Sequence, residues 1–276
     1  MKPDNKAAIG IFDSGIGGLT VVNAVMKTLS GENIIYFGDT ARVPYGIKSV
    51  ETVREYAFQI TDFLIRKKVK MIIIACNTVS AAAELQLIQK CKPFNIPVLG
   101  VIDSGAKAAF AQPSISKKIG VIGTLATVGS GAYEQAIQKL DSEIQVYSKA
   151  CPLLVPIAEE GWADTDIARQ TLEIYLESFK NKNLDALILG CTHYPLFKDQ
   201  IIAVLQDPNM KIVDSADVIA KKTREVLQLK NMLNDQEKGS FECFVSDKPQ
   251  RFQHLAELFL GQRINRVEIV SLPIAN

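Results

Sequence analysis

The most constraining feature of this sequence is a regular alternation between short apolar runs and longer amphipathic segments. The runs are rich in Ile and Val and too short for helices, as is typical of buried strands. We expect these strands at 7–12, 33–37, 70–75, 97–102, 117–122, 144–147, 186–189 and 211–213. Strands that alternate with helices predict an α/β fold with mainly parallel sheets flanked by helices.

The segments between the runs have helical periodicity, and 49–68 is the clearest example. Its apolar residues recur at intervals of three and four, and basic residues gather at its end. The carboxyl-terminal stretch differs, because expected strands at 240–245 and 266–272 flank a helix at 249–260. We expect this tail to close one edge of a sheet, after a polar connector at 227–239.

The chain also repeats itself at the scale of a domain. Ile9–Ser14 is echoed by Ile119–Thr124, and Met71–Thr78 is echoed by Ala186–His193. The repeat predicts two pseudo-symmetric domains of similar build. Ligands of open parallel sheets bind beyond the carboxyl ends of the strands, so we expect the active site in the cleft between the two domains.

Composition excludes several classes of function. The 276 residues fit one large or two modest domains, and 31 basic against 30 acidic side chains give no field that would attract nucleic acid or an anionic membrane. The two histidines are too few for the usual catalytic zinc sets, so no metal site is expected. The sequence has neither a signal-peptide core nor an apolar window long enough to span a membrane, and we expect a cytoplasmic protein.

The five cysteines lack CxxC pairs, which argues against a disulfide framework or a zinc ribbon. Cys76 and Cys191 differ from the others because each ends an expected strand, follows a small residue and precedes a helix start. Free backbone N–H groups and the positive helix end are expected to lower the pKa of both thiols. A lone cysteine there is usually a buried filler, whereas a pair in duplicated contexts indicates function. Cys91, Cys151 and Cys243 are interpreted as fillers.

Two thiols that face each other across a cleft can invert a stereocentre, because one removes a proton from carbon and the other returns one to the opposite face. His193 lies two residues from Cys191 and would share its side of an extended segment, so it could set the protonation of that thiol. A satisfied core histidine is the alternative. His254 has no comparable neighbours and is interpreted as structural.

Two loops add candidate binding groups. The turn Asp13–Gly18 follows the first strand and is either an anion site or simply a tight turn, since it lacks the Walker lysine and the third glycine of a dinucleotide fingerprint. Asp13 either handles protons or caps a helix. The loop Gly38–Gly46 ends in Pro-Tyr-Gly, which walls a pocket or makes a turn; taken alone, a turn is favoured.

Together these motifs resemble those of the glutamate racemases, within the aspartate/glutamate racemase family. The segments that carry the resemblance are 12–21, 38–46, 75–78 and 189–195, and their order and spacing match along most of the chain. His193 stands where aspartate racemases carry an acidic residue, whereas Val79 departs from the alanine usual in glutamate racemases.

The resemblance implies a cofactor-independent racemase that interconverts L- and D-glutamate with two thiol bases and supplies D-glutamate for peptidoglycan. Cys76, assisted by Asp13, would deprotonate the D form, and Cys191, assisted by His193, the L form. The residues that would hold the substrate are Asp13, Ser14, Tyr45, Gly46, Asn77, Thr78, Thr192 and His193, with Thr124 added from its place in the duplicated strand end. Glu159 resembles part of a family segment near the second thiol.

The resemblance further implies a homodimer and a discontinuous first domain. That domain would comprise 1–98 and 209–276, with the second domain inserted at 99–208. No lysine is a clear anchor for pyridoxal phosphate, and no cofactor is expected.

Two other functions stay open. An aspartate racemase would need a pocket shorter by one methylene, a difference worth only about 1–3 kcal/mol. A two-lobed binding protein could use the same cleft without chemistry, although such proteins are usually exported and binding does not require thiols.

Overall fold

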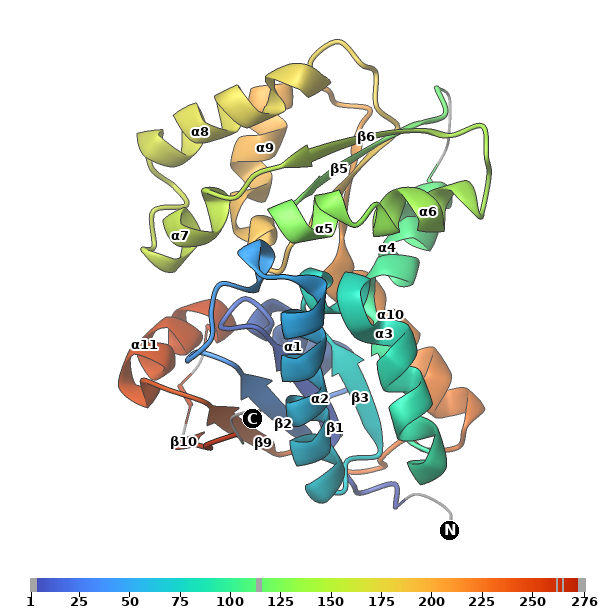
Figure 1. Ribbon diagram of the computed structural model, residues 1–276, viewed down its shortest axis with the longest axis vertical. Helices are drawn as coiled ribbons and strands as arrows, with labels where there is room; N and C mark the ends of the chain where they lie inside the picture. Colours follow the sequence, from blue (N-terminus) through green and yellow to red (C-terminus); the bar gives the residue numbers. More distant parts are fainter. Residues whose placement is uncertain (1–3, 113–115, 262, 265, 273–276) are drawn as a thin grey trace.

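The computed structural model describes residues 4–112, 116–261, 263–264 and 266–272. The chain forms two lobes, each built on a parallel sheet flanked by helices (Figure 1). This architecture confirms the predicted fold class.

The first lobe contains a six-stranded sheet in the order β10-β9-β2-β1-β3-β4. Its strands are β1 (Ile9–Asp13), β2 (Ile34–Gly38), β3 (Met71–Ile74), β4 (Val98–Gly100), β9 (Phe241–Val245) and β10 (Val267–Ile269). Every residue of β1, β2 and β3 is buried, which explains why these strands are apolar throughout rather than alternating. The tail strands β9 and β10 extend the sheet beyond β2, as expected for an edge.

The second lobe contains a four-stranded sheet in the order β6-β5-β7-β8. Its strands are β5 (Lys118–Gly123), β6 (Gln145–Ala150), β7 (Ala186–Gly190) and β8 (Lys211–Asp214). The same order recurs in the first sheet as β2-β1-β3-β4, so the repeat seen in the sequence is also a repeat of topology.

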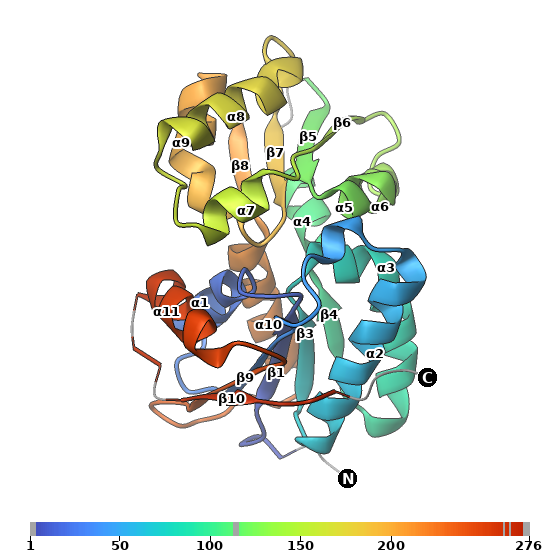
Figure 2. The ribbon, with the colours of Figure 1, turned by 60° about the vertical axis from the view of Figure 1, so that its left-hand side comes forward.

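Helices cover both faces of each sheet (Figure 2). They are α1 (Leu19–Thr28), α2 (Val50–Arg66), α3 (Asn77–Cys91), α4 (Val101–Phe110), α5 (Leu125–Gly129), α6 (Ala132–Gln138), α7 (Leu154–Glu159), α8 (Asp166–Leu176), α9 (Lys198–Leu205), α10 (Ser215–Leu229) and α11 (Pro249–Leu260). Short 3₁₀ turns lie at Tyr45–Ile47, Lys92–Phe94, Glu177–Phe179 and Tyr194–Phe197. The core between the first sheet and α1, α10 and α11 includes Leu19, Ile219 and Phe252.

Two helices exchange lobes. α4 follows β4 of the first sheet, yet its Ile102 and Ala106 pack in the core of the second lobe with Val121. α10 follows β8 of the second sheet, yet its Ile219 packs in the core of the first lobe. The chain therefore crosses between the lobes twice, directly after β4 and directly after β8.

The structure differs from the sequence-based expectation at the first crossing. The strand expected at 97–102 ends at Gly100, and its last apolar residues begin α4 instead. A short apolar run does not distinguish a buried strand from a buried helix turn, so the hydrophobic pattern could not predict where β4 ends and α4 begins. Sheet membership places 98–100 in the first lobe and 211–214 in the second, and the division at 98 and 209 stays a prediction.

No helix among the residues placed in the structure is long and apolar enough to span a membrane. Within the same residues, no group of three or more His, Cys, Asp or Glu side chains could hold a metal ion.

Candidate active site

A cavity of about 350 Å³ lies at the carboxyl ends of strands from both sheets. Its walls include the residues that directly follow β1, β5 and β7, and the second residue after β3, which is where open parallel sheets bind ligands. Of the predicted site residues, the cavity is lined by Ser14, Tyr45, Gly46, Cys76, Asn77, Thr78, Thr124, Cys191, Thr192 and His193. Glu159 also lines it, whereas Asp13 lies behind the wall.

The two thiols occupy equivalent positions in the duplicated topology. Cys76 follows β3 and precedes α3, and Cys191 follows β7, the strand that corresponds to β3 in the second sheet. Both side chains are buried except where they reach the cavity. Cys76 Sγ donates to Ser14 Oγ over 3.6 Å. The fold thus brings a thiol from each lobe to one small space.

The expected lowering of the pKa is wrong for Cys76. Burial, together with the negative charge of Asp13, raises the pKa of this thiol to about 12. The backbone N–H of Val79 and the hydroxyl of Ser14 oppose the rise, but the loss of solvation is larger. Cys76 therefore keeps its proton at neutral pH until a ligand or proton acceptor changes its surroundings.

His193 connects the second thiol to a carboxylate. Its Nδ1 lies 3.8 Å from Cys191 Sγ, and its Nε2 lies 3.2 Å from Glu159 Oε1. Burial by itself lowers the pKa of His193, but the hydrogen bonds to Cys191 and Glu159 raise it to about 10. A charged imidazole beside Cys191 can stabilise the thiolate of this residue or return a proton to it.

Asp13 occupies the turn that could have served as an anion site. Its Oδ2 accepts the N–H groups of Gly15 (3.1 Å) and Gly18 (3.0 Å), so the turn binds this carboxylate rather than leaving both donors to a ligand. Asp13 is not the N-cap residue of α1, because that helix begins at Leu19 after Gly18. Burial raises the pKa of Asp13, and the positive charge of His193 offsets part of this rise.

The glycine turn also meets the loop that carries the second thiol. A Cβ atom at Gly17 would lie 2.3 Å from Thr192 Oγ1 and 2.6 Å from His193 Nδ1. Thr20 Oγ1 donates to Thr192 O over 3.3 Å, again across the two lobes. Only glycine leaves room for this approach of the lobes.

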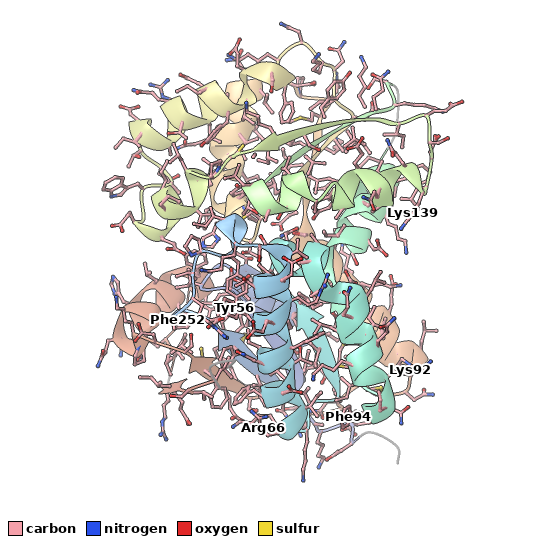
Figure 3. The ribbon with its side chains drawn as sticks, viewed as in Figure 1. Tyr56, Arg66, Lys92, Phe94, Lys139 and Phe252 are labelled. Carbon is pink, nitrogen blue, oxygen red and sulfur yellow. The ribbon has the colours of Figure 1, made fainter. Side chains whose placement is uncertain are left out.

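The 39–47 loop forms a wall of the cavity rather than a free turn. Tyr45 is buried, and its hydroxyl donates to Asp39, which also accepts from Arg42 Nε (2.6 Å) and Ser246 Oγ (2.7 Å). The Arg42 guanidinium lies 4.0 Å from the ring centre of Tyr56, a residue that Figure 3 places on α2 just below the junction of the lobes. Sequence reasoning missed Asp39, although a carboxylate directly after a strand was the available signal.

Three hydroxyls join the lobes at the other side of the cavity. Thr78 Oγ1 lies 3.0 Å from Thr124 Oγ1 and 3.3 Å from Thr127 Oγ1, and the latter two are 3.0 Å apart. Thr127 was also missed, because one threonine in a short helix carries no distinguishing pattern.

The remaining candidates are structural. Cys91, Cys151 and Cys243 pack in three different hydrophobic cores, and burial raises the pKa of Cys151 to about 12. His254 is exposed on α11.

Comparisons with known proteins place this site in a family. The Asp/Glu/hydantoin racemase family model matches residues 14–223. A glutamate racemase of Syntrophus aciditrophicus is 50% identical over 96% of both chains, and one of Chlorobaculum tepidum is 48% identical over 98% of both. A likeness to Picrophilus torridus aspartate racemase, at 19% identity and a TM-score of 0.54, is one of fold alone.

Comparison with solved structures also shows similarity to glutamate racemases. Francisella tularensis glutamate racemase in complex with D-glutamate has a TM-score of 0.90 and 41% identity, covering 97% of this chain and 98% of that one. Glutamate racemase of Thermus thermophilus in complex with β-chloro-D-alanine has a TM-score of 0.87 and 44% identity, covering 98% of both chains. The resemblance inferred from four sequence motifs is therefore confirmed, and the chain belongs to the Asp/Glu/hydantoin racemase family.

Proposed function

We propose that this protein is a glutamate racemase, an isomerase that interconverts L- and D-glutamate. The observation that carries the proposal is the pair of thiols, Cys76 and Cys191, which end equivalent strands of two duplicated sheets and line one cavity. Close relatives named glutamate racemase align along nearly the whole chain.

In the proposed reaction, one thiolate removes the α-proton of glutamate and the opposite thiol returns a proton to the other face. Cys76 acts on the D form with Asp13 and Ser14 beside it, and Cys191 acts on the L form with His193. The high pKa of Cys76 makes its thiolate a strong base. His193 and Glu159 keep a proton available to Cys191.

Neutral donors hold the substrate in this proposal. Among the described residues, those that line the cavity include no Lys or Arg, so the two carboxylates of glutamate bind to hydroxyls, amides and backbone N–H groups. The donors are Ser14, Asn77, Thr78, Thr124 and Thr192, with Tyr45 and Gly46 forming the facing wall and Asp13 and His193 near the thiols. The same groups stabilise the charge that develops as the α-proton leaves, without a cofactor.

We also propose a homodimer that works in the cytoplasm and supplies D-glutamate for peptidoglycan, as the family resemblance suggests. The domain division goes with it: a discontinuous first domain and a second domain inserted between the two crossings. Moving the boundaries to follow Gly100 and Asp214 agrees best with the membership of the two sheets.

The proposal is tested by incubating the purified protein with L-glutamate in deuterated water and no added cofactor. D-Glutamate that carries deuterium at the α-carbon is the expected product. Exchange with aspartate but not with glutamate would replace the substrate while keeping the chemistry. Binding of glutamate without exchange would instead support a binding protein.

A further inference from the structure

Asn77 makes a hydrogen bond across the two lobes that the proposed chemistry does not use. The hydroxyl of Tyr133 in α6 donates to Asn77 Oδ1 over 2.6 Å, and both residues are 2% exposed. Asn77 is the first residue of α3 and directly follows Cys76. The contact therefore reaches from the second lobe to the residue beside a proposed catalytic thiol.

The other end of the same amide has no partner. Asn77 Nδ2 is buried, yet no group among the described residues accepts a hydrogen bond from it. A buried donor without an acceptor is unfavourable, and such groups usually face a ligand or water. Asn77 lines the cavity, so this donor is available to an acceptor bound there.

Tyr133 is held firmly enough to fix the amide. Its ring lies between two glycines, since a Cβ atom at Gly105 would be 3.2 Å from Tyr133 Cε1 and one at Gly190 would be 3.1 Å from Cε2. Gly190 directly precedes Cys191, so this ring packs against the residue before the second thiol while its hydroxyl reaches the neighbour of the first. Burial raises the pKa of Tyr133, so the hydroxyl keeps its proton and donates.

We propose that Tyr133 is a positioning residue for substrate binding: by occupying Asn77 Oδ1, it fixes the amide so that Nδ2 donates to a carboxylate of the bound amino acid. A reversed amide would present Oδ1 to the carboxylate and repel it. The inference rests on the proposed function, because it assumes an amino-acid substrate in this cavity. It also makes correct orientation of Asn77 depend on the relative placement of the two lobes.

The test uses Tyr133→Phe, which removes one oxygen and keeps the ring between Gly105 and Gly190. We expect KM for glutamate to rise up to about tenfold, the scale of one charge-assisted hydrogen bond, while kcat changes by less than about threefold. Tyr147→Phe is the matched control, because its hydroxyl bonds Gln145 on the edge strand β6 of the same lobe. It should leave both constants unchanged.

A double-mutant cycle separates positioning from general damage. In an Asn77→Ala background, Tyr133→Phe should have no further effect on KM, because the amide through which it acts is absent. Equal effects of Tyr133→Phe with and without Asn77 would overturn the inference, as would an unchanged KM in the single variant. Thermal unfolding and circular dichroism report whether each variant is folded.

One measurement needs no Tyr133 variant. With ¹⁵N-labelled asparagine, the Asn77 side-chain amide should give a single pair of resonances that shifts when D-glutamate is added. Two pairs in the free protein would mean two amide orientations and would refute the inference. A wild-type protein that fails to racemise glutamate would instead remove the proposed function, leaving the amide orientation to be read from the same spectrum.

Discussion

Glu159 Oε1 lies 3.2 Å from His193 Nε2, on the opposite side of the imidazole from Cys191. The carboxylate holds the ring and favours its charged form, and the hydrogen bonds on both sides raise the pKa of His193 to about 10. We therefore expect this pair to tune the proton supply of Cys191, while the other thiol lies beside Asp13 and Ser14.

Removing the negative charge of Glu159 tests this arrangement. Glu159→Gln should lower the pKa of His193, so that the alkaline limb of the pH profile of kcat moves to lower pH. We expect kcat at neutral pH to fall about tenfold, less than the loss of a direct acid or base. Glu143→Gln removes a charge from an exposed ion pair with Lys117 and serves as the control. Superimposable pH profiles for wild type and Glu159→Gln would contradict the role given to Glu159.

The titration of His193 also makes the stability of the protein depend on pH. The folded-state pKa of His193 lies above its unfolded value of about 6.5, so its contribution is complete below pH 6.5 and is lost as the pH rises towards 10. Burial also raises the pKa of Glu84 from 4.5 to about 7, so the Glu84 contribution is complete below pH 4.5 and is lost as the pH rises through 7, at the lower edge of that window. Urea unfolding of wild type and Glu159→Gln between pH 6 and 10 isolates the His193 part, and the two should converge at the alkaline end.

Loss of either thiol should stop racemisation. Cys76→Ala and Cys191→Ala are expected to lower turnover at least about 1,000-fold, since each removes one of the two proposed proton-transfer groups. In deuterated water, Cys191→Ala should exchange the α-proton of D-glutamate only, and Cys76→Ala that of L-glutamate only. Cys151→Ala, in the core of the second lobe, should lower the melting temperature and keep turnover. Wild-type rates in either active-site variant would refute the two-thiol mechanism.

A substitution at Gly17 tests whether the reaction depends on the close approach of the two lobes. In Gly17→Ala the new methyl group would overlap Thr192 and His193, so the loop of the second thiol must move. We expect kcat/KM to fall about 100-fold, as a misplaced acid/base group does, with a loss of about 1–3 kcal/mol in unfolding free energy. Gly129→Ala, at the end of α5 with open space around its Cβ position, is the matched control. Wild-type kinetics in Gly17→Ala would show that the turn at Gly17 and the loop of the second thiol can move apart without loss of activity.

A buried ion pair far from the cavity should affect stability alone. Lys70 Nζ lies 2.5 Å from Glu32 Oε2 and donates to the carbonyls of Asn5 and Met232, at the start of β3. Lys70→Met would leave the buried Glu32 carboxylate uncompensated and should lower the unfolding free energy by about 3–5 kcal/mol. Adding Glu32→Gln should recover part of that loss. Activity per folded molecule should stay at the wild-type value, and a large drop in kcat would contradict this separation.

Local sequence patterns were sufficient for the elements and the general position of the site. The apolar runs predicted the strands, and the carboxyl-end rule directed attention to Cys76 and Cys191 before any contact was known. The tail at 240–272 was correctly expected at a sheet edge. The pattern did not separate β4 from α4, because Val101 and Ile102 are apolar in either conformation.

Sequence by itself determined the α/β alternation, the repeat and the family, because hydrophobic periodicity and motif order are written along the chain. Tertiary structure alone decided which helices exchange lobes, which groups surround each thiol and how the pKa of Cys76 shifts. Burial and electrostatic interactions depend on residues distant in sequence, as with Tyr133 and Asn77, or Glu159 and His193. No local pattern encodes the removal of water that makes Cys76 a weak acid.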